Sequence, residues 1–274
     1  MRFILTLAFL LSCQAATITV CASGCTTTSF QTALNNAARG DVVELKSGET
    51  FEGAFSVPYK AGTDYITIRP SRWREWPPAG TRITTAHQAQ LATIQPPDTT
   101  SPLLSAGGTQ QYVSSVDTGT DAITFSGAHG FLDNDPIACW NDDGTIPITE
   151  NTIYYVRDKT STTLKLALLP GGSAIDLTTT PTATRFRCTI AKPITNWRIQ
   201  GIEFRTKPGQ LSQYNLVQIG IEEAVRESIP RNIEFSHSYI HGIEGENGPR
   251  ICMFLNAAAF SLTDSRIEHC NKEG

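Results

Sequence analysis

The sequence predicts an all-β protein whose strands stack as a solenoid, and three observations carry that prediction. A nine-residue pattern occurs three times in the last third of the chain, at residues 196–204, 232–240 and 259–267. A short amphipathic helix signal and several short strands precede it near the N-terminus. Between these regions, residues 109–187 carry the alternation and turn signals of antiparallel hairpins, which indicates a module inserted into the stack.

The repeated pattern has apolar residues at its second, fourth and ninth positions, with polar or small residues mostly between them. Alternation with period two is typical of strands, because successive side chains of a strand point to opposite faces. Self-similar strands separated by 36 and then 27 residues are typical of a solenoid, in which each coil buries its apolar face against its neighbours. We therefore expect the three repeats to stack in register as strands.

The first 15 residues have the parts of a secretory signal: one basic residue, an apolar run too short to span a bilayer, and small residues before Ala16. We expect cleavage after Ala15 and a secreted protein, extracellular or periplasmic. A buried N-terminal strand is the alternative. The residues before Cys13 also resemble a bacterial lipoprotein site, which would leave that cysteine lipidated. No other stretch is long and apolar enough for a transmembrane helix.

Six cysteines remain after such a signal, and an even number in an exported chain favours disulfides. The sequence does not choose among the many pairings, but we expect Cys21 with Cys25 and Cys139 with Cys188. The formal net charge is −4, and Lys and Arg form no cluster. Nucleic acid is therefore not an expected partner, because phosphate binding needs a basic surface.

A short amphipathic helix is predicted between residues 28 and 40. Thr28 and Gln31 have the spacing of a capping box, apolar residues share one helical face, and Gly40 lies where a left-handed C-terminal cap belongs. Such a helix covers the open end of a solenoid, where an apolar interior and an unpaired strand edge would otherwise be exposed. Short strands bounded by turn residues are expected at residues 17–20, 41–45, 51–53 and 65–69.

This region carries a resemblance to a known family. Residues 30–45, followed by Gly48, Phe51 and Gly53 and then residues 66–68, resemble the entry to right-handed parallel β-helix proteins of the pectin lyase fold. The match is to their capping helix, their Gly-Asp turn and their first strands. Together with the repeats, the resemblance covers residues 17–105 and 188–274.

The resemblance implies a right-handed parallel β-helix that binds or cleaves extracellular polysaccharide. Lyases of this fold use Arg or Lys as the base and Ca²⁺ held by acidic residues, but no motif here matches those positions residue by residue. A polysaccharide lyase or a glycoside hydrolase is the expected enzyme, if the chain is one. The fold also serves adhesins and phage tail proteins, so a non-catalytic surface or adhesive protein, adhesin-like or tail-spike-like, is the alternative.

The inserted module is predicted to contain two hairpins, with strands at residues 112–116 and 122–125 and at residues 152–156 and 163–168. Motifs between His129 and Thr178 are similar to a module found on phage tail and other surface proteins, which implies display or contact. Its aspartates are interpreted as turn residues, because their spacing does not fit a calcium loop. They are Asp133, Asp135, Asp142 and Asp143.

Residues 70–108 are expected to be mostly loop around a strand at residues 92–94. Trp73 and Trp76 lie close together among prolines in this segment. They either stack on sugar rings or fill a small core of the loop itself.

Stacking the repeats predicts two polar columns, one of Gly201, His237 and Asp264 and one of Arg205, His241 and Glu268. Neighbouring coils lie about 4.8 Å apart, so the histidine of each column can pair with its carboxylate. Such groups can support acid–base catalysis or bind a cation that neutralises an acidic sugar, and a solvated polar ladder is the alternative. The candidate catalytic residues are His237, Asp264, His241, Glu268 and Arg205.

The predicted organisation has four parts. They are a signal at residues 1–15, a cap and first coils at 16–108, the inserted module at 109–187 and further coils at 188–274. The third repeat is followed by no polar cap, and an uncapped last coil exposes an apolar interior and a pairing edge. We therefore expect further coils beyond Gly274, or another chain that covers this end.

Overall fold

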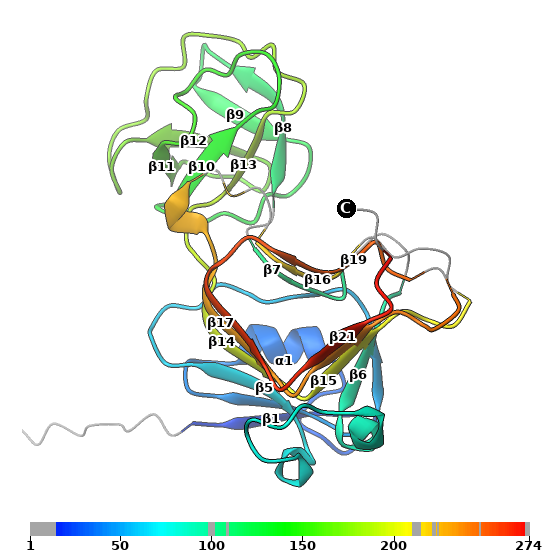
Figure 1. The fold of residues 1–274 in the computed structure, drawn as a ribbon. Coiled ribbons are helices and arrows are strands. Elements are labelled where there is room, and N and C mark those ends of the chain that lie inside the picture. Colours follow the sequence, from blue (N-terminus) through cyan, green and yellow to red (C-terminus); the bar gives the residue numbers. More distant parts are fainter. Residues whose placement is uncertain are drawn as a thin grey trace, which may run out of the picture.

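The structure is a computed structural model that describes residues 15–97, 102–107, 110–209, 215–220, 223, 225–246 and 248–271. Three sheets of parallel strands form the sides of a stack, and a closed antiparallel barrel projects from one of its corners (Figure 1). The expected signal up to residue 14, with the lipoprotein site at Cys13, lies outside the described residues.

The three parallel sheets have six, five and four strands. The six-stranded sheet consists of β1 (Thr17–Val20), β2 (Val42–Leu45), β5 (Ile66–Pro70), β14 (Thr195–Gln200), β17 (Arg231–Ser236) and β20 (Ala258–Thr263). The five-stranded sheet consists of β3 (Thr50–Glu52), β6 (Ala92–Gln95), β15 (Ile202–Arg205), β18 (Tyr239–His241) and β21 (Arg266–Glu268). The four-stranded sheet consists of β4 (Phe55–Ser56), β7 (Leu104–Ala106), β16 (Asn215–Ile219) and β19 (Ile251–Leu255).

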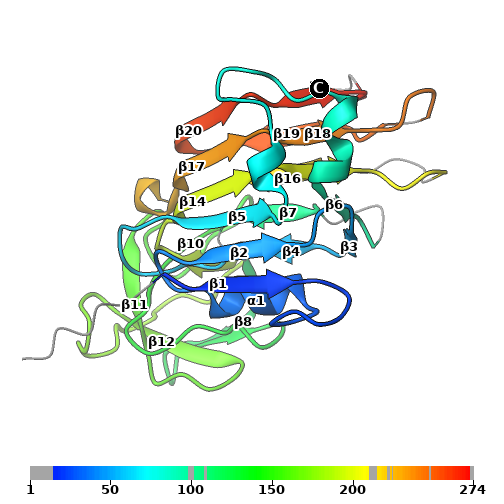
Figure 2. The ribbon, with the colours of Figure 1, turned by 90° about the horizontal axis from the view of Figure 1, so that it is seen from below.

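From β2 onward the chain visits the three sheets in a constant order, and one passage through them is called a circuit here. Strands β2, β3 and β4 make the first circuit, β5 to β7 the second, β14 to β16 the third and β17 to β19 the fourth. Strands β20 and β21 continue this order. The strands of the six-stranded sheet lie one above another from β1 to β20 (Figure 2), and every pairing within the three sheets is parallel.

The three repeats lie in register, as predicted. Their second positions are Cα partners, since Trp197 faces Ile233 and Ile233 faces Phe260. Their ninth positions are partners in the five-stranded sheet, where Phe204 faces Ile240. The inner side chains of the repeats join one core that runs through the stack, in which Trp197 is fully buried.

The repeat is nevertheless two strands and not one, which corrects the expectation of a continuous nine-residue strand. The residue at its sixth position has a left-handed backbone, with φ of 62° at Gly201, 49° at His237 and 51° at Asp264. This bend directs the chain from the six-stranded to the five-stranded sheet. The bend explains why apolar positions four and nine both point inward although they are five positions apart, an odd offset that would place them on opposite faces of a straight strand.

The predicted helix is present as α1 (Phe30–Asn36), but both of its ends differ from the prediction. The N-cap is Ser29, whose hydroxyl accepts from the backbone N–H of Thr32 at 3.2 Å. The C-cap is Ala37, and the Asp41 carboxylate accepts from the next backbone N–H, at Ala38, at 2.8 Å. The helix packs its apolar face on the end of the shared core (Figure 1).

The segment after β5 contains more regular structure than predicted. Two 3₁₀ helices, Trp73–Glu75 and Thr85–Gln90, precede β6, which includes the expected strand at residues 92–94. The segment at residues 71–91 lies against the corner between the six-stranded and five-stranded sheets (Figure 2). Strand β7 was not predicted, because three residues are too few to show an alternation.

The module between β7 and β14 is a closed barrel with strand order β10-β11-β12-β9-β8-β13. Its strands are β8 (Gln111–Asp117), β9 (Ala122–Phe125), β10 (Pro136–Trp140), β11 (Ile153–Arg157), β12 (Thr163–Ala167) and β13 (Arg187–Ile190). Both predicted hairpins pair antiparallel, whereas β10 and β13 were missed because they pair with each other across a long loop. The barrel has its own apolar core and extends past the expected boundary at residue 187.

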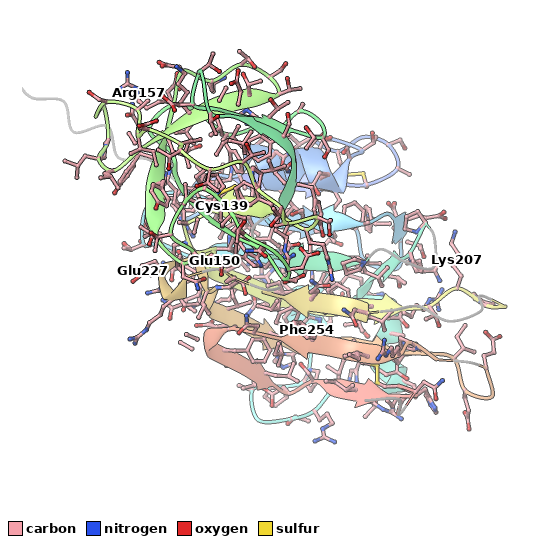
Figure 3. The ribbon with its side chains drawn as sticks, turned by 90° about the horizontal axis from the view of Figure 1, so that it is seen from above. Cys139, Glu150, Arg157, Lys207, Glu227 and Phe254 are labelled. Carbon is pink, nitrogen blue, oxygen red and sulfur yellow. A yellow bond between two sulfur atoms is a disulfide. The ribbon has the colours of Figure 1, made fainter. Side chains whose placement is uncertain are left out.

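The described part of the chain contains three disulfides. The expected Cys21–Cys25 and Cys139–Cys188 bonds both form, and the latter joins β10 to β13 inside the barrel (Figure 3). The third, Cys252–Cys270, ties β19 to the segment after β21. Within the described part of the chain, no helix has the length and apolar character needed to cross a bilayer.

Candidate functional site

The first predicted column lies at the corner between the six-stranded and five-stranded sheets. The Nε2 atom of His237 is 3.8 Å from Oδ2 of Asp264, so the predicted neighbours do come together. The segment at residues 71–91 covers them. The Trp76 ring stacks on His237 with centroids 5.1 Å apart and an interplanar angle of 13°. The backbone N–H of Gly80 donates to Asp264 Oδ2 at 3.1 Å.

Gly201, the third member of this column, explains how Trp76 reaches the corner. A Cβ built on Gly201 would lie 2.0 Å from Cζ2 of the Trp76 ring, so only glycine leaves room for it. His237 is 9% exposed, and its side chain lies under the indole. The first column therefore anchors the covering segment to the stack.

The second column, Arg205, His241 and Glu268, lies in register on the outer face of the five-stranded sheet, as predicted. The expected His241–Glu268 pair does not form. Nε2 of His241 lies 3.0 Å from Oε1 of Glu203, in the preceding circuit. Tyr239 stacks on the His241 imidazole with ring centroids 3.8 Å apart. The Tyr239 hydroxyl donates to Glu268, so this carboxylate is bound to the tyrosine and not to the histidine.

Glu203 is the most enclosed acid of this face, with 3% of its surface exposed. Besides the contact with His241, it accepts from Oγ1 of Thr93 at 2.5 Å and from Nε2 of Gln88 at 2.8 Å. Burial by itself raises the pKa of this carboxyl, but the hydrogen bonds from His241 and Thr93 outweigh burial and hold the pKa below its usual range. Glu203 is therefore an anion that links segments from three parts of the chain.

Glu268 is held in a similar way at the last strand. It accepts from the Tyr239 hydroxyl and from Nε of Arg266 at 2.6 Å. Burial raises the pKa of Glu268, but the hydrogen bonds from Tyr239 and Arg266 lower it by more than burial raises it. The pKa of Glu268 therefore lies below its ordinary value. Burial and the bond to Glu268 both raise the pKa of Tyr239, so the phenol stays protonated.

Arg205 completes the second column and is partly exposed. Its Nη1 atom lies 4.0 Å from Oε1 of Glu203. With the Gln95 amide oriented so that its oxygen faces the guanidinium, that oxygen accepts from Arg205 Nε at 2.7 Å and from Nη2 at 3.0 Å. At the edge of the same face, Lys207 lies on a loop (Figure 3) and pairs with Glu52 at 2.5 Å.

Sequence reasoning missed Glu203 and Tyr239, although both occupy the eighth position of the repeat. This position reads Glu203, Tyr239 and Arg266, and the structure pairs the three as Cα neighbours in that order. The signal was present in the alignment of the repeats. Including the eighth position would have given a second outward column two residues before each member of the Arg205 column.

The fold resemblance implies bound calcium, but the described residues do not form a set of acidic ligands that could hold it. Among the residues that the structure describes, no group of three His, Cys, Asp or Glu side chains is arranged to hold a metal ion. The aspartates of the module make protein contacts instead. Asp142 binds Arg187 through two 2.8 Å bonds, and Asp143 accepts from Thr184.

Trp73, the second tryptophan of the covering segment, is also engaged by its own surroundings. The guanidinium carbons of Arg69 and Arg74 lie 4.3 and 4.4 Å from the ring centroid. Trp73 therefore packs on arginines close to it in the chain, whereas Trp76 packs on His237 and Gly201 of the stack and not in a core of its own loop.

No protein-family model and no curated protein matches this chain. Among solved structures, it is similar to the tailspike protein gp49 from Pseudomonas phage LKA1 over 81% of this chain and 36% of that one, with 14% identity and a TM-score of 0.21. It is also similar to the tailspike gp61 from Pseudomonas phage phi297 over 86% of this chain and 41% of that one, with 11% identity and a TM-score of 0.24. The chain thus spans less than half the length of either tailspike.

Proposed function

We propose that this chain is an exported surface protein in which a right-handed parallel β-helix carries a small barrel and binds extracellular polysaccharide without cleaving it. The constant order in which the chain visits three parallel sheets supports the β-helix. The three disulfides support export, because such bonds persist in oxidising compartments.

The observation that carries the non-catalytic function is the state of the two glutamates in the polar columns. A general acid needs a carboxyl pKa raised toward neutrality, and the pKa values of Glu203 and Glu268 are both lowered. Glu203 also accepts from His241 and Thr93 of the neighbouring circuits, and Glu268 accepts from Tyr239 of the preceding circuit and from Arg266 of its own strand. Such groups serve better as links between circuits than as proton donors.

Two features of the molecule favour a polysaccharide as the ligand. A stack of similar circuits presents side chains at a regular spacing of about 4.8 Å, which fits a polymer with a repeating unit. Exposed tyrosines provide flat apolar surfaces beside polar groups, as sugar rings require. Tyr59 is 39% exposed.

Retention of the intact protein on immobilised polysaccharides tests this proposal. A polyuronate and a neutral glucan are compared, and soluble polymer is added as competitor. We expect saturable retention that the matching soluble polymer abolishes. Failure to be retained on either polymer would contradict polysaccharide binding.

A polysaccharide lyase or hydrolase is the alternative, and the predicted catalytic residues give it a separate test. If His237 or Asp264 acts in catalysis, His237→Ala or Asp264→Ala abolishes cleavage while the fold survives. Because both residues lie beneath the segment at residues 71–91, we expect these changes to loosen that segment instead. Limited proteolysis of this segment distinguishes the two outcomes.

A further inference from the structure

A cavity of about 240 Å³ lies where the barrel joins the stack, in a place that neither polar column reaches. It lies between α1, the loop after β4 and the two connections that join the barrel to the stack. Gly107 lines it from the connection that leads into the barrel, and Lys192 from the connection that leads out of it. Ligand sites occur preferentially at such junctions between units. The volume is below the roughly 300–1,000 Å³ of sites for drug-sized molecules, and it suits a single sugar residue.

The cavity wall combines an exposed aromatic ring with polar groups that the protein already holds in place. Tyr59 is 39% exposed. Gln31 is fixed by two bonds to the backbone of Ser56, at 2.8 and 2.9 Å, and its Nε2 donates to Oδ1 of Asn35 at 2.9 Å. The Asn35 amide is thereby oriented with its nitrogen available as a donor. Preorganised groups of this kind reduce the entropy lost on binding.

The charge of the cavity selects the ligand. None of its ten lining residues is acidic, and one, Lys192, is basic. Nζ of Lys192 lies 5.3 Å from the Tyr59 ring centroid and 2.7 Å from Oδ1 of Asp135, which holds the ammonium group beside the ring. Lys60 is not part of the lining but lies next to it, and its Nζ donates to the backbone oxygen of Asn35 at 2.5 Å. A lining that holds a lysine and no acid favours an anionic ligand.

We infer that this junction cavity binds one uronate residue of an acidic polysaccharide. The inference rests on the proposed function and names its ligand class and its site. The pyranose ring stacks on Tyr59, the carboxylate pairs with Lys192, and the Asn35 amide donates to a hydroxyl oxygen. Neither polar column takes part in it.

The test titrates the full chain with D-galacturonate and, as the neutral match, D-galactose, by saturation-transfer NMR. We expect millimolar binding of galacturonate and at least about tenfold weaker binding of galactose. Tyr59→Ala should weaken galacturonate binding by about tenfold or more, and Asn35→Ala by a smaller factor. Lys192→Met should abolish the preference for the acid.

Tyr112→Ala is the matched control, since Tyr112 is similarly exposed but lies on the barrel away from the cavity lining. Because Lys192 also binds Asp135, the melting temperature of each variant is measured, and Asn35→Ala keeps that ion pair intact. Equal affinity for the two sugars, or full binding by both Tyr59→Ala and Asn35→Ala, would overturn the inference.

Retention on polysaccharide separates this inference from the proposed function. If the intact chain is retained while the cavity variants are retained equally well, polysaccharide binding stands and the cavity is the wrong site. If neither polymer nor monosaccharide binds, both proposals fail.

Discussion

Replacing Ala259 with asparagine should stabilise the stack, because this position breaks a ladder that the two preceding circuits form. Asn196, Asn232 and Ala259 start the three repeats and have φ values of 55°, 56° and 57°. Nδ2 of Asn232 donates to Oδ1 of Asn196 at 2.8 Å, and Asn196 donates to the backbone oxygen of Thr63 at 2.7 Å. An asparagine at position 259 would extend this ladder to Asn232 by one bond.

Two terms give the size of the effect. An ordinary L-residue pays roughly 1–2 kcal/mol for a left-handed backbone, whereas asparagine adopts it readily, so the change recovers about 1 kcal/mol. The new amide bond to Asn232 adds about 0.5 kcal/mol, the lower end of the range because the site is exposed. Together they raise the free energy of unfolding by about 1.5 kcal/mol, which corresponds to a rise in Tm of about 3–6 °C.

Thermal and urea unfolding of Ala259→Asn, followed by circular dichroism, measure this change. Ala258→Asn is the matched control, because it adds the same side chain at an exposed neighbour that has no left-handed backbone. Ala259→Gly removes the backbone strain without the new bond and should fall between the wild type and the asparagine variant. If Ala259→Asn is no more stable than Ala258→Asn, the ladder argument is wrong.

Two other predictions concern the covered column and the buried acid. Gly201→Ala places a Cβ 2.0 Å from Trp76, so we expect the free energy of unfolding to fall by about 2 kcal/mol or more. Residues 71–91 should also be cleaved faster by a protease than in the control Gly127→Ala, whose Cβ meets nothing within 4 Å. Equal cleavage rates would refute the contact. The folded pKa of Glu203 is lowered, so its stabilisation is present above the unfolded pKa of about 4.3 and lost as pH falls through the folded value. Urea unfolding should therefore show declining stability below about pH 5, with a shallower decline in Glu203→Gln, and identical pH profiles would count against this role.

The stacking of the repeats was readable from sequence because it depends on a short period and on residues close together in the chain. Apolar positions two, four and nine placed Trp197, Ile233 and Phe260 in register. The bend within each repeat was also visible in principle. The sixth position holds Gly201 and Asp264, residue types that tolerate a left-handed backbone.

What could not be read were the contacts set by segments distant in sequence. Trp76 covers His237 from a segment more than 150 residues earlier in the chain, and no local pattern specifies where that segment folds back. The choice of partner for His241 likewise depends on a competition. Tyr239 takes up the Glu268 carboxylate and leaves Glu203 for the histidine, which only the three-dimensional register reveals.

The length of a bound polysaccharide tests the central claim most directly. The protein is incubated with an excess of a soluble polyuronate to which it binds. The size distribution of the polymer is then followed by size-exclusion chromatography over many hours. Our account predicts saturable binding and an unchanged polymer, because Glu203 and Glu268 are anions committed to neighbouring circuits. Progressive shortening that is abolished by His241→Ala would contradict it and would assign the second polar column to catalysis.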